Sequence, residues 1–361
     1  MNAPRRLLAL IAVATAAVLT GCSGASAGLG GGAAETPRLA DVTPIADPAS
    51  WEGGTSAVAP TSPVDPITDG EQSLPVTLTD SQGTQVEIDD TSRILALDIY
   101  GSLARTVYEL GFGDRVVGRD LSSGFAEAAD LPLVTQNGHD LNAEAILELA
   151  PTVILTDTSL GPWDTILQMR DAGVDVVVVD SKRSIDSIGS LVQSVADALG
   201  VPQRGAVLAE RIDAEVADTV AEIGAIAPAE GDRLRMIFLY VRGQSGVYYM
   251  FGEESGADAL VTALGGVDVS SEIGWTGMRP ITDEGLVAAA PDLVLVMTKG
   301  LESVDWVDGL IQAVPALAQT PAGEHRRIVD MDDTQILSFG PDTPRVLEAL
   351  AVAIYAPDQA S

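Results

Sequence analysis

The pattern of apolar and polar positions predicts a chain in which strands and helices alternate from about residue 74 onward. Residues 76–79 and 84–88 alternate with a period of two around Ser81-Gln82-Gly83, which predicts a β-hairpin. An apolar run at 93–97 predicts a buried strand. Further patterns predict strands at 115–118, 153–156 and 174–179, and helices at 142–149 and 163–172. This alternation favours an α/β fold with mostly parallel sheets covered by helices.

Residues 184–226 interrupt that alternation with two segments of helical periodicity. The second segment runs from about 202 to 223 and places on one face Val207, Leu208, Ile212, Val216 and Val220. At 1.5 Å per residue this helix is roughly 30 Å long, about the height of a domain. Because the strand pattern restarts at 234–241, we expect the helix to join two lobes.

An internal repeat supports two equivalent lobes. Residues 141–155 align with 281–295, and each copy has a helix that stops at a proline, Pro151 or Pro291, before an apolar strand. Asn142 and Thr282 occupy the matching N-cap positions. A chance match of one helix–strand unit is the alternative, but cap, stop and strand agree in both copies, which favours duplication.

The N-terminus has the pattern of a bacterial lipoprotein signal. Arg5 and Arg6 precede an apolar run at 7–19 that is too short to span a bilayer, and Leu-Thr-Gly-Cys22 resembles a lipobox. Cys22 is the only cysteine, so we expect it to carry the lipid after residues 1–22 direct export; a plain cleaved signal with a free thiol is the alternative. Residues 23–73 are rich in small and polar residues and predict a flexible tether.

Composition limits the partners of the chain. The formal net charge is −32, with only two lysines, Lys182 and Lys299, so the surface repels nucleic acid. A well-solvated acidic exterior accounts for most of this charge. A single cysteine permits no internal disulfide, so packing must supply the stability.

Three residues form the candidate chemistry. His139 lies in a polar turn before the repeat helix, and Tyr240 and Arg242 lie two apart near the end of a predicted strand, so they point to the same side. An adjacent guanidinium favours an ionised phenol. Imidazole and phenolate are good ligands for ferric iron. Each residue taken alone also has a purely structural interpretation: a solvated loop histidine, a tyrosine packed in the core and a surface arginine.

The hairpin, the 93–97 strand, the duplicated helix–Pro–strand unit and the long helix together resemble the substrate-binding proteins of ABC importers for siderophores, corrinoids and haem. The resemblance covers about residues 74–357. Within that class, Asn-Gly-His139-Asp-Leu-Asn and Tyr240-Val-Arg242 are similar to the haem-binding lipoproteins of haemin importers. The resemblance implies a non-enzymatic, monomeric protein that is lipid-anchored outside the cell membrane. It also implies delivery of ferric haem b, ligated by His139 and Tyr240 in a cleft between lobes, to a permease and its ATPase.

The same resemblance defines the expected lobes and the secondary site residues. We expect lobes at 74–183 and 229–361, joined by helices within 184–228. Cleft geometry suggests further haem contacts from Tyr100, Trp275, Met278, Arg279 and Met297, with Arg279 meeting a propionate. At the repeat offset Tyr100 pairs with Tyr240 and His139 with Arg279. Docking to arginines of the permease is expected at one acidic residue per lobe, Asp164 and Glu302.

Two alternatives remain at this point. A ferric-siderophore or corrinoid binding protein would have the same fold. An enzyme is disfavoured because the chain lacks a Gly-x-Gly-x-x-Gly fingerprint after its first strand and a Gly-x-Ser-x-Gly elbow. A site for free zinc or manganese is disfavoured because only two histidines exist.

Overall fold

The computed structural model describes residues 36–60, 62–243 and 248–360. The predicted signal segment and Cys22 lie outside these residues. Within the described part, no helix has both the length and the apolar character needed to cross a membrane.

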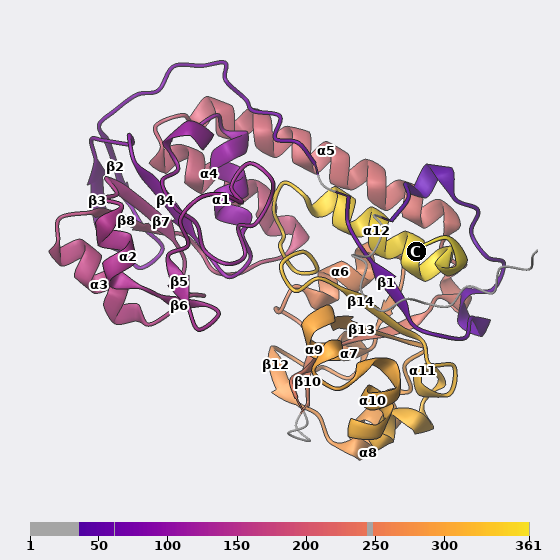
Figure 1. Ribbon diagram of the computed structural model, residues 1–361. Coiled ribbons are helices and arrows are strands. Elements are labelled where there is room, and N and C mark those ends of the chain that lie inside the picture. The colour runs from indigo at the N-terminus through magenta and orange to yellow at the C-terminus, as the bar shows by residue number, and fades with distance from the viewer. Residues whose placement is uncertain (1–35, 61, 244–247, 361) are drawn as a thin grey trace, which may run out of the picture. The chain divides into compact units, whose positions relative to one another are not determined.

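The N-terminal lobe is built on a parallel sheet in the order β4-β7-β8, with strands Ile94–Leu97, Val153–Thr156 and Asp175–Val178 (Figure 1). Two antiparallel pairs join it: β2 (Val76–Thr79) with β3 (Gln85–Ile88), and β5 (Thr135–Gln136) with β6 (Asp140–Leu141). Its helices are α1 (Ser102–Glu109), α2 (Ala143–Glu148) and α3 (Trp163–Asp171). The predicted hairpin is confirmed.

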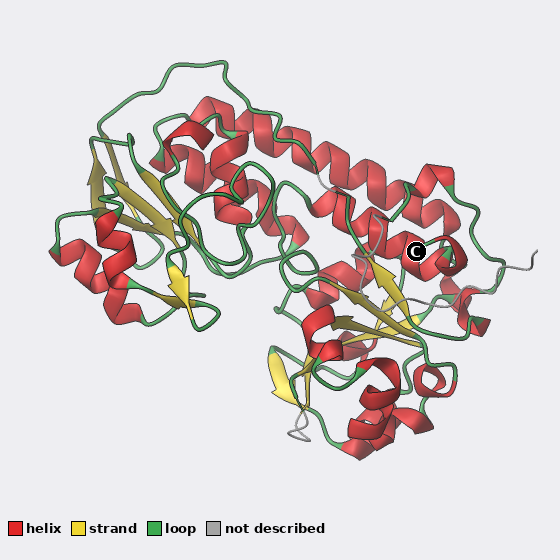
Figure 2. Ribbon diagram, in the orientation of Figure 1, coloured by secondary structure: helices red, strands yellow, loops and turns green. Residues whose placement is uncertain are grey.

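The C-terminal lobe has a mixed sheet (Figure 2). Its strands follow the order β1 (Thr55–Ala57), β14 (Ile328–Met331), β13 (Leu293–Met297), β9 (Arg235–Val241), β10 (Tyr248–Phe251) and β12 (Met278–Pro280), with β11 (Val267–Asp268) also paired to β9. Its helices are α6 (Ala257–Ala263), α7 (Val269–Glu272), α8 (Asp283–Ala289), α9 (Thr298–Glu302), α10 (Trp306–Ala313), α11 (Pro321–Glu324) and α12 (Thr343–Tyr355). Strands β9, β13 and β14 repeat the parallel order of β4, β7 and β8.

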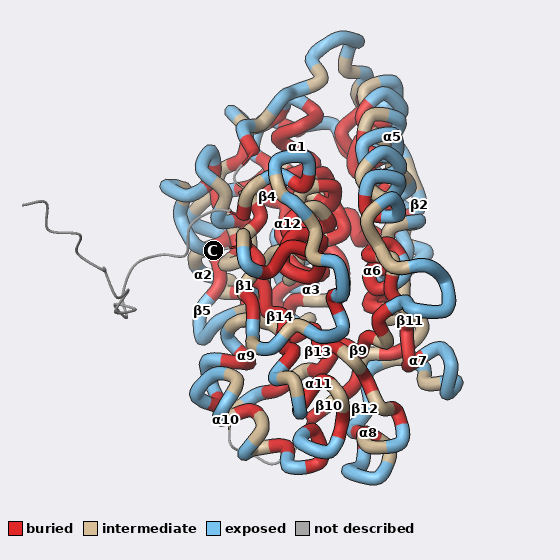
Figure 3. Tube along the Cα trace, turned by 90° about the vertical axis from the view of Figure 1, so that its right-hand side faces the viewer, coloured by how far each residue is buried: buried red, intermediate tan, exposed pale blue. Residues whose placement is uncertain are grey.

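Two consecutive helices, α4 (Ile188–Ala198) and α5 (Pro202–Ile226), follow the N-terminal lobe. Helix α5 contacts both α4 and α12, so it touches elements on either side (Figure 1). Its buried residues recur at helical spacing: Gly205, Leu208, Ile212, Val216 and Ile223. The remaining face is exposed along most of its length (Figure 3). Val207, predicted on the apolar face, is exposed; that prediction is wrong, because the neighbouring Leu208 occupies the buried row.

Short 3₁₀ helices connect these elements at Leu39–Asp41, Pro48–Ser50, Gly113–Arg115, Ile185–Ser187, Glu230–Asp232, Pro315–Gln319 and Pro357–Gln359. The first two lie in the segment predicted to be a flexible tether. There the structure differs: β1 pairs in parallel with β14, the backbone N–H of Ile45 donates to the Tyr355 carbonyl at 2.8 Å, and Leu39 is buried. A few apolar side chains and an open sheet edge are enough to dock a segment whose composition has no period.

Burial explains why the central strands form. All four residues of β4, β7 and β14 are buried, as expected for parallel strands with helices on both faces. In β4, Ile94 and Ala96 pack into the core shared with α1, α4 and α12, while Leu95 and Leu97 pack against the side of Ile146 and Ile166. The predicted strand at 115–118 is reduced to a single bridge between Val116 and Ile94.

Candidate binding site

His139 lies in the tight turn between β5 and β6. Asn137 and Gly138 adopt left-handed conformations, with φ of 50° and 94°, and the turn holds the imidazole in a half-buried position. Among the described residues, the buried Nδ1 atom of His139 has no hydrogen-bond partner. Burial lowers the pKa of His139, and the positive charges of Lys299 and Arg242 lower it further. The ring is therefore kept neutral, which is the form that ligates a metal.

Tyr240 and Arg242 lie side by side at the end of β9, as the spacing predicts. The Nη1 atom of Arg242 donates a hydrogen bond to Tyr240 Oη at 3.0 Å, which confirms their predicted contact. The ring of Tyr240 is half-buried, and the rings of Tyr249 and Phe251 on β10 stand edge-on to it, each with its centroid 6.4 Å away. The guanidinium makes this a charge-assisted hydrogen bond.

Arg242 connects the two halves of this site. It donates to Tyr240 in the C-terminal lobe, and its charge acts on the imidazole of His139 in the N-terminal lobe. His139 and Tyr240, a hundred positions apart in the chain, thus lie within the electrostatic reach of the same guanidinium.

Register determines which other residues share the face of Tyr240. Phe251 lies opposite Phe238 and beside Met278, so the ring and Met278 face the same way as Tyr240. Met278 is 49% exposed. On the other side Val296 pairs with Leu239, which places Met297, half-buried, beside Tyr240 at the ends of neighbouring parallel strands.

Arg279 and Trp275 are held together instead. Arg279 pairs with Met250, on the face opposite Tyr240, and its guanidinium lies 4.5 Å from the centroid of the Trp275 ring. The indole Nε1 donates to the Met250 carbonyl at 3.1 Å. The structure therefore does not bring these two predicted contacts to the face of Tyr240.

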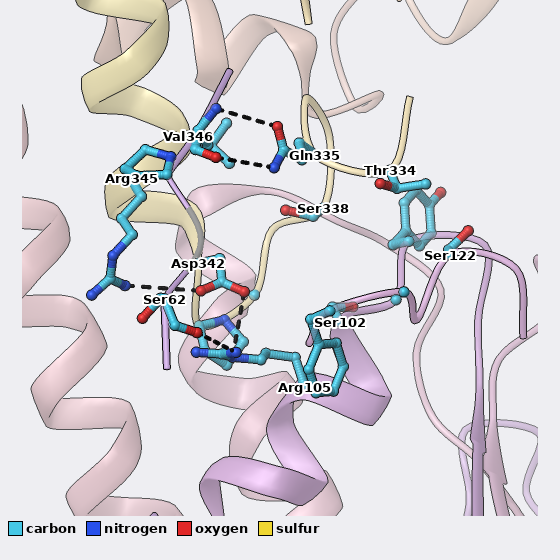
Figure 4. Close-up of a pocket in the computed structure, with 18 of the residues that line it drawn as sticks. Ser62, Ser102, Arg105, Ser122, Thr334, Gln335, Ser338, Asp342, Arg345 and Val346 are labelled. Carbon is cyan, nitrogen blue, oxygen red and sulfur yellow. Dashed lines mark hydrogen bonds and ion pairs between the residues drawn. The ribbon is translucent and has the colours of Figure 1, made fainter. Parts of the chain in front are cut away.

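Tyr100 lines a separate cavity of about 250 Å³ (Figure 4). The walls come from α1, from residues 59–60 and 62, and from parts of 121–125 and 334–346. They include Arg105 and Asp342, which form an ion pair at 3.4 Å. Neither His139 nor Tyr240 lines it, and its volume lies below the range usual for pockets that enclose larger organic ligands. Burial raises the pKa of Tyr100, so its phenol stays neutral.

Lys299 and Asp333 are two further residues near the site that the sequence pattern did not predict. Both charges act on His139, and Asp333 Oδ1 accepts the backbone N–H of Lys299 at 3.0 Å. The signal available in the sequence was the scarcity of lysine together with its place two residues after the strand that ends at Met297. The docking candidates Asp164, in the first turn of α3, and Glu302, at the end of α9, are both exposed.

The described residues offer no site for a metal ion held by a cluster of protein side chains. In residues 36–60, 62–243 and 248–360, no cluster of three or more His, Cys, Asp or Glu side chains is arranged to hold a metal ion. One imidazole and one phenol suit a metal whose remaining ligands come from a macrocycle.

The fold consists of two α/β lobes joined by the long helix α5. A family model described as "Periplasmic binding protein" matches residues 99–334, more than half of the chain, and the chain belongs to this family. Its members are substrate-binding components of transporters. The predicted fold class and the prediction that the chain is not an enzyme are therefore confirmed.

Three relatives illustrate the similarity. The crystal structure of the heme binding protein HmuT is 40% identical, covers 86% of this chain and 99% of its own, and superposes with a TM-score of 0.79. HmuT has also been crystallised with a tyrosine, an arginine or a histidine replaced. The periplasmic heme-binding protein RhuT from Roseiflexus sp. RS-1 is 36% identical, with a TM-score of 0.66, and covers 75% of this chain and 100% of its own.

The third relative is YvrC of Bacillus subtilis, an uncharacterized ABC transporter substrate-binding lipoprotein. It is 24% identical over 287 residues, which are 78% of this chain and 86% of YvrC.

Proposed function

We propose that this protein binds ferric haem outside the cytoplasm and delivers it to an ABC permease, with the iron held between His139 and Tyr240. The observation that carries the proposal is the double role of Arg242, which donates to Tyr240 and faces His139 with its charge. The resemblance to HmuT and RhuT, both named as heme-binding proteins, supports haem as the ligand. Attachment to the membrane through a lipid on Cys22 belongs to the same proposal.

The donor chemistry fits ferric iron and carriage rather than catalysis. A phenolate is a hard, anionic ligand that favours Fe(III), and the hydrogen bond from Arg242 places a positive charge at the oxygen of Tyr240. An imidazole on the opposite face completes six-coordination, so no position is left for dioxygen or peroxide. Met278, Met297 and Phe251 supply polarisable and apolar contacts for the macrocycle at the same edge.

The test is an absorption titration of the purified protein with haemin. We expect an intense Soret band in the wild type, and a shifted band with weaker binding in His139→Ala and Tyr240→Phe variants. In Arg242→Ala, Tyr240 remains but loses its donor, so we expect weaker ligation than in the wild type.

Two matched variants serve as controls. His325→Ala removes the other histidine, at the end of α11, and Tyr248→Phe removes a phenol on the opposite face of β10 that donates to Asp283. Both should retain the wild-type band. Spectra unchanged in both ligand variants, or tighter binding of a ferric siderophore or corrinoid than of haemin, would contradict the proposal.

A further inference from the structure

Lys299 lies close in the chain to the end of the sheet where Tyr240 is found. Met297 and Tyr240 end the neighbouring parallel strands β13 and β9, and Lys299 follows Met297 by two residues, at the second position of α9. It is exposed, and only one other lysine occurs in a chain of net charge −32. One of the two lysines of the chain therefore lies at this edge.

The ammonium of Lys299 has no carboxylate partner in the described part of the chain. Its backbone N–H donates to Asp333, but its side chain forms no ion pair there. Seven of the described arginines, by contrast, pair with carboxylates: Arg105, Arg170, Arg183, Arg211, Arg235, Arg326 and Arg345. Acidic residues are abundant in this protein, yet none of those described forms an ion pair with Lys299.

The charge of Lys299 also acts on the other lobe. After burial, its charge is the largest influence that lowers the pKa of His139, ahead of Arg242. Two cations from the C-terminal lobe, Lys299 and Arg242, thus act on the imidazole together with the carboxylates of Asp333 and Asp140. An exposed ammonium that forms no ion pair can attract an anionic group of a ligand held beside His139.

Resting on the proposed function, we propose that Lys299 binds a side-chain carboxylate of the tetrapyrrole and makes the site selective for ligands with ionised carboxylates. Haem b carries two propionates, which an ammonium on a long, exposed stem can reach. Arg279, which the sequence suggested for this task, is held over Trp275 on the opposite face. Lys299 is therefore the better-placed cation.

The experiment compares haemin with its dimethyl ester, whose carboxylates are uncharged, in the wild type, Lys299→Met and Lys182→Met. Lys182 is the matched control, an exposed lysine in the loop after β8. We expect the ester to bind the wild type about tenfold more weakly than haemin, the size of one charge-assisted contact. Lys299→Met should lose a similar factor for haemin and bind both ligands alike, and Lys182→Met should behave as the wild type.

The Soret band distinguishes the role of Lys299 from the binding of haem itself. Because Lys299 is not a ligand to iron, the haemin complex of Lys299→Met should keep the wild-type band position. A Lys299→Met variant that still prefers haemin to the ester by the wild-type factor would overturn the role of Lys299 while the haem proposal stands. A wild type that binds neither compound would instead overturn the proposed function itself.

Discussion

At the scale of single residues, an unusual group of charges lies beneath Tyr100. Arg183 Nη2 lies 2.6 Å from Asp157 Oδ2 and 3.7 Å from Asp98 Oδ2, and the Asp98 backbone N–H donates to Asp120 Oδ2 at 3.0 Å. Two buried carboxylates thus share one guanidinium, and a third, that of Asp120, accepts the Asp98 backbone N–H. The guanidinium also lies 5.1 Å from the centroid of the Tyr100 ring. Burial raises the pKa of Asp98 to about 6 and that of Asp120 to about 7.

These shifts predict a pH dependence of stability. A carboxyl whose pKa is higher in the folded than in the unfolded chain binds more protons when folded, so its ionisation destabilises the fold. The free energy of unfolding should fall as pH rises from about 4 to about 7. In Asp120→Asn we expect a shallower slope over that window, although the amide offers one acceptor fewer than the carboxyl and should lower the stability overall.

Urea unfolding at several pH values measures that slope. Asp164→Asn is the control, since it removes one exposed negative charge that is not in the buried group. A slope in Asp120→Asn equal to that of the control would show that Asp120 does not hold its proton to neutral pH.

At the scale of elements, the two copies of the repeat end their helices in the same strained way. Helix α2 begins at the Asn142 cap and α8 at the Thr282 cap, each accepting a backbone N–H, as predicted. After each helix an alanine adopts a left-handed conformation, with φ of 42° at Ala150 and 43° at Ala290. Each is followed by a proline that leads into a central strand.

Replacing these alanines with glycine should stabilise the protein. A left-handed conformation costs an alanine roughly 1–2 kcal/mol, and glycine avoids this cost. The greater conformational freedom of glycine in the unfolded chain offsets part of that gain. We expect Ala150→Gly and Ala290→Gly each to raise the free energy of unfolding by up to about 1 kcal/mol, additively. Thermal or urea unfolding tests this, with Ala145→Gly inside α2 as a control that should lose about 1 kcal/mol. Destabilisation by both cap variants would refute the argument.

At the scale of the whole molecule, two similar lobes are tied together by polar contacts as well as by α5. Arg105 on α1 pairs with Glu109 at 2.9 Å and with Asp342 before α12 at 3.4 Å. Glu109 also accepts from Arg211 on α5 at 2.7 Å, and Arg211 reaches Asp65 at 3.1 Å. Each lobe follows its middle parallel strand, β7 or β13, with a helix carrying an exposed acid, Asp164 or Glu302.

This equivalence predicts how the protein meets its permease. If Asp164 and Glu302 each contact arginines of the transporter, reversal of either charge should lower haem uptake severalfold, and reversal of both should lower it further. Haem binding should be unchanged, because both residues lie outside the candidate site. Uptake by cells expressing Asp164→Lys, Glu302→Lys or both, set beside the Soret titration, measures this. Glu324→Lys, an exposed acid on α11, is the control. Normal uptake in the double variant would contradict the docking role.

Much of the architecture follows from local pattern. Strand β7 has the predicted bounds, 153–156, and α3 and β9 begin within one residue of prediction, because buried parallel strands and capped helices leave strong signals in sequence. The contact between Tyr240 and Arg242 was also predictable, since residues two apart on a strand share a face. Val116 illustrates the opposite case, because a short apolar run does not determine whether a strand or a bridge forms.

The sequence by itself determined the order of the elements, their duplication and the identity of the candidate ligands, because these depend on periods, caps and residue types within short stretches. Tertiary structure alone decided that residues 36–60 dock on the C-terminal lobe, that Arg279 stacks on Trp275, and that Lys299 and Arg242 face His139. Those outcomes depend on strand register and on contacts between residues far apart in the chain, where a shift of one position sends a side chain to the other face of a sheet.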